Sequence, residues 1–173
     1  MTETAALPQE KPLIEAVNVS RVLTEAVPVT LVRDVNLVIF PREFVAITGP
    51  SGSGKSSLLY LLGLLDLPSE GEVRMLGRPT AKISEDERAR IRLEGLGFVF
   101  QFHFLLPEFT ARANVMLPMR ALGVLSESEM RRRADDILAQ LGLAEHAAKR
   151  PDQMSGGQRQ RVAVARALAN DPP

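Results

Sequence analysis

A glycine-rich segment at residues 49–56 (GPSGSGKS) constrains the fold of this chain more than any other feature of the sequence. It follows the apolar run Phe44 to Thr48 (FVAIT), which lacks the polar alternation of a half-exposed strand and is typical of a strand buried on both faces. The leucine-rich residues after it, Lys55 to Leu65, favour a helix. The order strand, glycine loop, helix predicts an α/β fold with this loop at the carboxyl end of a parallel strand.

Length and composition predict one globular domain without a strong charge. The chain has 173 residues, of which 45% are hydrophobic and 24% charged, which is enough for one core and too few to expect two. Basic and acidic residues number 21 each, so the net charge gives no reason to expect nucleic acid as a partner. The sequence contains no cysteine, which excludes a disulfide framework and a thiolate metal site and favours a reducing compartment.

The N-terminal residues predict no signal peptide, and the apolar stretches predict no membrane-spanning helix. Residues 1–12 carry acids and prolines and lack the pattern of a signal peptide, so we expect a flexible tail there. The longest apolar stretches, such as Leu58 to Leu67, fall short of the roughly 20 residues that cross a bilayer. Any membrane-spanning partner is therefore expected to be another chain.

Other segments predict a β layer and two capped helices. Partial alternation over Leu13 to Val19 and Val27 to Ile39 predicts antiparallel strands with one wet face, and Leu96 to Phe100 (LGFVF) predicts a second buried strand. Helices are expected over Ser84 to Leu93 and Ser126 to Leu143. Each begins with serine followed three residues later by glutamate, which is a capping-box pattern.

The glycine-rich segment matches the P-loop pattern in its required context between strand and helix. Glycines allow backbone N–H groups to converge on phosphate oxygens at the positive end of the helix. Lys55 is expected at the β and γ phosphates, and the Ser56 hydroxyl at Mg²⁺. The predicted ATP-binding residues are Gly49, Pro50, Ser51, Gly52, Ser53, Gly54, Lys55, Ser56 and Ser57. The P-loop alone leaves small-molecule kinases, GTPases and motor ATPases open.

A second motif narrows the choice among these classes of P-loop protein. Ser155, Gly156, Gly157 and Gln158 precede a helix-type run, Arg159 to Leu168, that is rich in alanine, valine and arginine. The segment resembles the signature motif of ABC ATPases. In that family the motif contacts ATP held by the P-loop of a second subunit, so the resemblance implies a head-to-tail homodimer. A plain serine helix cap is the alternative for Ser155, although a cap does not predict the arginine-rich run that follows.

Gln101 directly follows the expected strand Phe98 to Phe100, where the ABC family places its Q-loop glutamine near Mg²⁺ and the attacking water. An amide oxygen is a suitable ligand for a hard cation. The resemblance therefore implies catalytic roles for Gln101 and Lys55 and a Mg²⁺ site made by Ser56 and Gln101. The alternative is a surface glutamine at the end of a strand.

The segment after Gln101, Phe102 to Ala111, resembles the ATP-binding subunits of lipoprotein-releasing (LolD-type) transporters and, more loosely, MacB-type exporters. This resemblance implies integral-membrane permease partners and a peripheral location on the cytoplasmic face of the inner membrane. Export of macrolides or peptides and a role in cell division are the alternatives. About two thirds of its five apolar residues are expected in the core: Phe102, Phe104, Leu105, Leu106 and Phe109. For His103, whose nearest histidine in sequence is distant His146, we expect capping or packing and no metal.

The resemblance implies an α/β P-loop NTPase fold of the ABC ATPase type. We expect a mostly parallel core sheet, an N-terminal antiparallel β layer and a helical subdomain inserted at residues 101–151. The family's adenine-stacking aromatic is replaced around Leu23. Because the family continues with the Walker B carboxylates and a switch histidine, we expect residues 1–173 to form an incomplete domain that binds ATP better than it hydrolyses it. A nucleotide-binding module without turnover is the second hypothesis.

Overall fold

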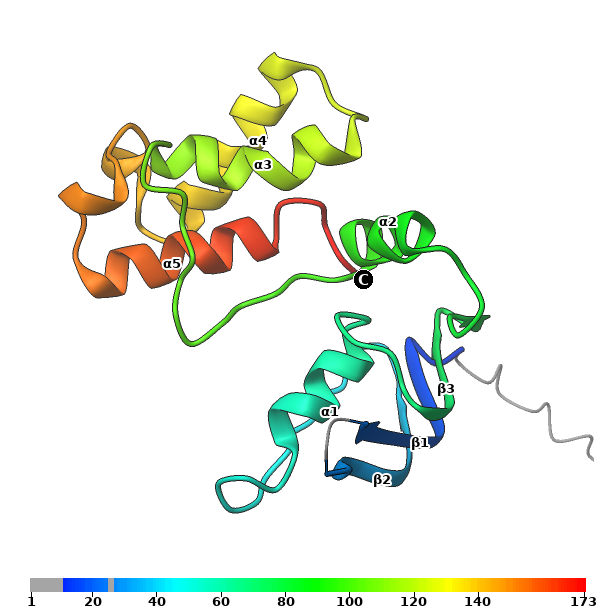
Figure 1. Ribbon diagram of the computed structural model, residues 1–173. Helices are drawn as coiled ribbons and strands as arrows, with labels where there is room; N and C mark the ends of the chain where they lie inside the picture. The colour runs from blue at the N-terminus through cyan, green and yellow to red at the C-terminus, as the bar shows by residue number, and fades with distance from the viewer. Residues whose placement is uncertain (1–10, 25–26) are drawn as a thin grey trace, which may run out of the picture. The chain divides into compact units, whose positions relative to one another are not determined.

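The computed structural model describes residues 11–24 and 27–173, so most of the expected tail at residues 1–12 lies outside the described part. The chain divides into two compact units, with the boundary between Arg88 and Ala89 (Figure 1). The inserted subdomain at residues 101–151 stays a prediction.

An antiparallel sheet forms the base of the first unit. Its strand order among the described residues is β2-β1-β3-β4. The strands are β1 (Ile14–Leu23), β2 (Val29–Ile39), β3 (Glu70–Met75) and β4 (Arg78–Pro79). Strands β1 and β3 bury Ala16, Val19, Ser20 and Val73, and register irregularities in β1 interrupt its alternation of buried and exposed residues. The antiparallel β layer expected from the sequence is therefore confirmed.

Helix α1 (Lys55–Leu62) begins directly after the glycine-rich loop and packs on β1 and β2. Leu61 and Leu64 at its end are fully buried, and this burial fixes the helix against the sheet. The helix was expected to reach Leu65, but it ends at Leu62. The backbone turns left-handed at Leu64, and the N–H group of Leu65 bonds back to the carbonyl of Tyr60.

Two strands expected in the parallel core sheet are not formed. Residues 44–48 and 96–100 have no regular secondary structure, and 97% of the Phe44 side chain is exposed. A strand requires a neighbour that offers its N–H and C=O groups. No parallel ladder occurs among the described residues, so these two apolar segments do not pair with a neighbouring strand. The local pattern gives the preference for burial but cannot supply the partner.

Helices dominate the second unit (Figure 1). Helix α2 (Glu85–Gly95) crosses the boundary between the units, and Ser84 caps it by accepting from the Glu87 N–H group. The other elements are α3 (Ala111–Leu122), α4 (Glu127–Gln140), the short 3-10 helices η1 (Ala144–His146) and η2 (Pro151–Gln153), and α5 (Gly156–Ala167).

Helices α3, α4 and α5 pack on one another around a common apolar core. Its fully buried side chains include Val115, Met119, Leu138 and Val162. The capping box predicted for Ser126 and Glu129 is present at the start of α4, which confirms that helix start. Among residues 11–24 and 27–173, no helix combines the length and apolarity needed to span a bilayer.

A buried asparagine holds the loop that precedes α3. The Asn114 side chain is fully buried and accepts from the Leu106 N–H group at 2.8 Å. Its amide nitrogen donates to the carbonyls of Leu106, Phe109 and Thr110 at 3.1, 3.2 and 3.1 Å. Buried backbone groups outside helices and sheets need such partners. The loop that follows the Gln101 segment therefore depends on this one side chain.

Replacing Asn114 by alanine is expected to lower the free energy of unfolding by about 2–4 kcal/mol, because the loop carbonyls lose their donor inside the core. Urea unfolding followed by circular dichroism measures this change. Exposed Gln140 at the end of α4 provides the control, and Gln140→Ala should change stability by less than about 0.5 kcal/mol. Equal stabilities of the two variants would contradict the role given to Asn114.

Candidate functional site

The glycine-rich loop has the backbone that its sequence predicts. Gly52 and Gly54 have φ angles of +79° and +85°, in the left-handed region that favours glycine. A Cβ atom at Gly54 would lie 2.2 Å from the Leu31 carbonyl oxygen, so only glycine allows the loop to approach β2 this closely. Gly54 also caps α1, whose first free N–H groups therefore open onto the loop.

Lys55 turns its ammonium group back into the loop. Its Nζ atom donates to the carbonyl oxygens of Gly49 and Pro50 at 3.0 and 2.7 Å. Carbonyl oxygens are neutral acceptors, and a phosphate oxygen is a stronger partner for the same cation. The loop therefore holds a positive charge that an incoming anion can bind by exchanging hydrogen bonds.

A concave site of about 380 Å³ lies between this loop and the start of β2. Its lining residues are Val29, Thr30, Leu31, Ser51, Gly52, Gly54, Lys55, Ser56 and Ser57. Hydroxyl groups, one cation and the helix start supply donors, and no carboxylate lines the site among the described residues. This donor set suits a phosphate group. Of the nine predicted ATP contacts, Gly49, Pro50 and Ser53 do not line it and shape the loop instead.

The signature segment forms a capped helix start in the second unit. The Gln158 N–H group donates to Ser155 Oγ at 3.3 Å, and the Ser155 N–H group donates to Gln158 Oε1 at 2.8 Å. This reciprocal capping box opens α5. A Cβ atom at Gly156 or Gly157 would meet no described atom within 4 Å. The fold of the described residues therefore gives no reason for glycine at these two helical positions.

Gln101 is exposed, and helix α5 holds the backbone on both sides of it. Gln160 donates to the Phe100 carbonyl at 3.2 Å. Arg166 donates to the carbonyls of His103 and Phe104 at 2.9 and 2.8 Å. Burial lowers the pKa of Arg166, which remains a cation because the pKa of arginine is so high. The Gln101 segment is thus fixed to the signature helix by two side chains.

Sequence reasoning did not identify Gln160 and Arg166 as supports. They lie in the arginine-rich run after the signature motif, and nothing in a single sequence indicates which loop carbonyl such a donor will reach. The supporting contact at Gly97 was also missed. A Cβ atom there would lie 2.2 Å from the Ala167 carbonyl oxygen, so the segment before Gln101 lies close against the end of α5.

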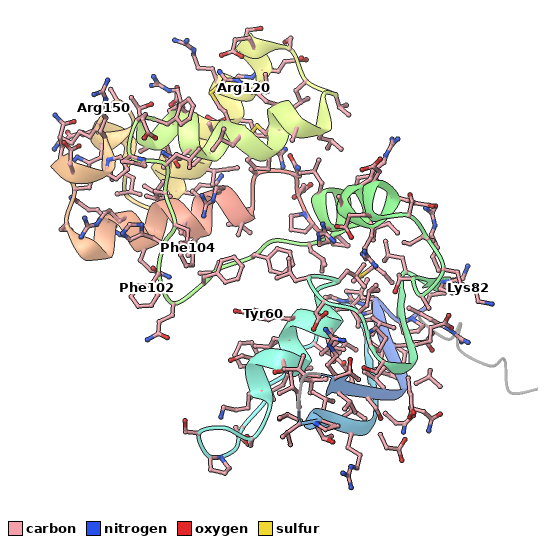
Figure 2. All side chains as sticks on the ribbon, in the orientation of Figure 1. Tyr60, Lys82, Phe102, Phe104, Arg120 and Arg150 are labelled. Atoms are coloured by element: carbon pink, nitrogen blue, oxygen red, sulfur yellow. The ribbon has the colours of Figure 1, made fainter. Side chains whose placement is uncertain are left out.

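The apolar residues after Gln101 are mostly exposed, which corrects the expectation of a core majority. Leu105 is buried, whereas Phe102 and Phe104 are 70% and 62% exposed, and Leu106 and Phe109 are also exposed. Figure 2 shows Phe102 and Phe104 on the irregular segment beside α5. Their rings pack edge to face on each other. Arg166 holds this segment by its carbonyls and Leu105 anchors it in the core, so Phe102 and Phe104 face outward.

The predicted site residues fall into two groups. The P-loop residues, including Lys55 and Ser56, belong to the first unit, whereas Gln101 and Ser155 to Gln158 belong to the second. Each group has a defined geometry within its own unit. No group of three or more His, Cys, Asp or Glu side chains suited to a metal occurs in the described part of the chain. The Mg²⁺ site shared by Ser56 and Gln101 stays a prediction.

A family model, related sequences and solved structures all show similarity of this chain to ABC transporter proteins. A family model described as ABC transporter matches residues 32–173. The lipoprotein-releasing system ATP-binding protein LolD of Maricaulis maris is 50% identical over 150 residues, which cover 87% of this chain and 65% of that protein. LolD 2 of Caulobacter vibrioides is 52% identical over 149 residues, with coverage of 86% and 65%. The chain thus spans about 65% of the length of these relatives.

A macrolide export ATP-binding/permease protein MacB of Marinobacter nauticus is 49% identical over 163 residues, which cover 92% of this chain and 25% of that protein. Among solved structures, the dimeric structure of MJ0796, a bacterial ABC transporter cassette, is similar with a TM-score of 0.85 and 44% identity. The alignment covers 92% of this chain and 71% of that one. A post-hydrolysis state of MJ0796 bound to ADP and Pi gives the same values. These similarities confirm the expected ABC ATPase type of fold with its antiparallel β layer and helices, whereas the parallel pairing expected for residues 44–48 and 96–100 is not formed in the described residues.

Two loop glycines provide a matched pair for a stability test. Gly52→Ala should cost about 1–2 kcal/mol, because the left-handed backbone disfavours alanine but the described residues leave the Cβ position open. Gly54→Ala should cost roughly 3 kcal/mol or more, because strain is added to the clash with the Leu31 carbonyl. Urea unfolding followed by circular dichroism compares the two. A Gly54 variant as stable as the Gly52 variant would contradict the close approach of this loop to β2.

Proposed function

This chain belongs to the ABC transporter family, and we propose that it is the ATP-binding part of a subunit that couples ATP binding and hydrolysis to transport. The observation that carries the proposal is the P-loop cavity, in which the Lys55 ammonium group lies against the loop carbonyls. The donors around this cavity fit the phosphates of a nucleotide. The similarity of the chain to MJ0796, which is described with bound ADP and Pi, supports the same ligand class.

Each P-loop residue has a proposed role in binding ATP. Lys55 exchanges its bonds to the carbonyls of Gly49 and Pro50 for bonds to the β and γ phosphates. The left-handed glycines expose backbone N–H groups, and the start of α1 adds its partial positive charge. Ser51 and Ser57 contribute hydroxyl donors at the edge of the cavity. Leu23, which ends β1, offers no aromatic ring for stacking on adenine.

Mg²⁺ is the proposed metal, held by the Ser56 hydroxyl and the Gln101 amide oxygen. Ser56 lines the cavity and Gln101 is exposed, so both oxygen atoms are available to a ligand. Mg²⁺ keeps several water and phosphate ligands, so a set with few protein oxygens fits it. When bound, this ion would neutralise part of the phosphate charge. Gln101 is also proposed to orient the water molecule that attacks the γ-phosphate.

A second copy of the chain is the proposed partner at the signature motif. Gly156 and Gly157 have no described neighbour at their Cβ positions, and glycine weakens a helix relative to alanine. Glycine at these two positions is explained if a ligand that is not part of this chain binds close to the backbone at the start of α5. In the proposed homodimer, Ser155 to Gln158 bind the γ-phosphate of ATP held by the partner's P-loop. The relative MJ0796 is described as dimeric, which supports this assembly.

Integral-membrane permease subunits are the proposed second type of partner, which places the chain peripherally at the cytoplasmic face of the inner membrane. The exposed rings of Phe102 and Phe104 are an apolar surface that fits such a contact. Lipoprotein release is the proposed transport process because of the LolD relatives, and macrolide export is the alternative because of MacB. The two are distinguished by which cargo stimulates ATP turnover once the membrane subunits are present.

Lys55→Ala is expected to weaken Mg-ATP binding by roughly 10- to 100-fold, because charge-assisted hydrogen bonds to the phosphates are lost. Calorimetric titration measures the affinity, and phosphate release measures turnover in parallel. The control is Lys82→Ala, since Lys82 is an exposed cation of the same unit (Figure 2). Equal loss of affinity in both variants would contradict the P-loop assignment. Binding without phosphate release in the unsubstituted chain would favour the alternative of a nucleotide-binding module.

Gly157→Ala should have opposite effects on the stability of the chain and on its ATP-dependent dimerisation. The substitution is expected to raise the free energy of unfolding by up to about 1 kcal/mol, since alanine favours helix and no described atom obstructs it. It should also weaken ATP-dependent dimer formation, because the added methyl group occupies the proposed phosphate surface. Sedimentation with and without ATP measures the dimer. Gly95→Ala, equally unobstructed at the end of α2, is the matched control and should leave the dimer unchanged. A normal dimer in the Gly157 variant would refute the proposed surface.

A further inference from the structure

The signature segment has a hydrogen-bond partner that neither the motif nor the proposed function assigns. His146, the last residue of η1, places its Nε2 atom 2.9 Å from the side-chain nitrogen of Gln158. Gln158 is one of the proposed ATP contacts and also closes the capping box of α5. A histidine side chain therefore contacts one of the residues proposed to bind phosphate.

The direction of this hydrogen bond follows from the other end of the Gln158 side chain. Its Oε1 atom accepts from the Ser155 N–H group at 2.8 Å, so its amide nitrogen faces His146. An amide nitrogen can only donate. The Nε2 atom of His146 is therefore the acceptor and carries no proton in this arrangement.

One orientation of the Gln158 amide satisfies both neighbours. Rotating the amide by half a turn would place its NH₂ group against the Ser155 N–H group, so that two donors would face each other. The acceptor at His146 and the donor at Ser155 thus select the same orientation from opposite ends. The state of the imidazole ring therefore changes how strongly this orientation, with Oε1 on Ser155, is favoured.

The neutral ring carries its proton on Nδ1. This atom is buried and has no hydrogen-bond partner among the described residues. A doubly protonated ring would keep that unpaired donor and would add a second N–H group at Nε2, directed at the Gln158 NH₂ group. Donors that face each other without an acceptor are unfavourable, and at this partly buried pair the Gln158 NH₂ group would lose its acceptor. Protonation of His146 therefore opposes the observed orientation of Gln158.

Charged side chains on the neighbouring segments do not replace this interaction. The charged residues on η1, on the following segment, on η2 and on the first turn of α5 are Glu145, Lys149, Arg150, Asp152 and Arg159. Helix α4, which packs on η1, carries Glu127, Glu129, Arg131, Arg132, Arg133, Asp135 and Asp136, and Arg112 of α3 is bonded to Asp135. Within the described residues, the Gln158 amide is the polar partner that the structure gives the His146 ring. The ring thus responds to protonation mainly through Gln158.

We propose that His146 is a positioning residue for Gln158, and that the neutral imidazole is needed for the signature segment to bind the nucleotide of the partner subunit. The second part rests on the proposed ATP-dependent homodimer. The first part concerns this chain alone. Loss of the acceptor at position 146, by substitution or by protonation, frees the Gln158 amide and weakens assembly on ATP.

The tautomers of the two histidines test the first part without any nucleotide. His146 and His103 are the two histidines of the sequence. The Leu105 N–H group donates to His103 Nδ1 at 3.3 Å, so neutral His103 carries its proton on Nε2. Nitrogen-15 NMR of the imidazole rings in the full chain is therefore expected to show opposite tautomers, with the proton on Nδ1 in His146. A proton on Nε2 of neutral His146 would overturn the proposal.

Substitutions test the second part. His146→Gln keeps an oxygen acceptor that does not titrate, and His146→Phe keeps a flat ring without an acceptor. ATP-dependent dimer formation of the unsubstituted chain should be weaker at about pH 5.5 than at about pH 8, because protonation removes the acceptor at His146 Nε2. The glutamine variant should lose this component of the pH dependence and keep the affinity. The phenylalanine variant should be weaker by roughly five- to tenfold at every pH.

His103→Gln is the control and should keep the pH profile of the unsubstituted chain. Identical pH profiles for the unsubstituted chain and the His146→Gln variant would overturn the role of protonation. An unsubstituted chain that forms no dimer on ATP, with the expected His146 tautomer, would contradict the proposed function and would still support the bond between His146 and Gln158. The two failures are thus distinguishable.

Discussion

Hydrogen bonds from side-chain donors to loop carbonyls are the interactions on which the functional segments of this chain depend. Lys55 holds the carbonyls of the P-loop, and Asn114 holds those of the loop before α3. Arg166 holds the segment after Gln101. These segments lie outside helices and sheets, so their backbone groups have no ladder to satisfy them. In each segment one side chain donates the hydrogen bonds that these carbonyls need.

The three donor side chains differ in how firmly they hold the loops to which they bond. The Lys55 ammonium group lies at a cavity, so in the proposed function its carbonyl partners are exchanged for phosphate oxygens. Asn114 is fully buried and has all its donors and acceptors engaged, so its loop is fixed. Arg166 lies between these cases and links the Gln101 segment to α5, the helix that opens with the signature residues.

Features with a local physical cause were predictable from the sequence. The capping boxes at Ser126 and Ser155 involve residues three positions apart, and their geometry is complete within one helical turn. The left-handed glycines and the start of α1 follow equally from the P-loop pattern. Features that need a distant partner were not predictable. Residues 44–48 and 96–100 have the composition of buried strands, yet pairing depends on a neighbour that composition does not name.

The sequence by itself determined the family and the chemistry of the proposed phosphate site, because glycine, lysine and serine at fixed spacing act through the backbone they belong to. Only the tertiary structure decided which residues support that chemistry. It brought Gln160 and Arg166 to the carbonyls beside Gln101, and it placed His146 behind Gln158. It also left Phe102 and Phe104 exposed. These contacts join segments that are 12 to 63 residues apart in the chain, and such distances are closed by packing and not by local preference.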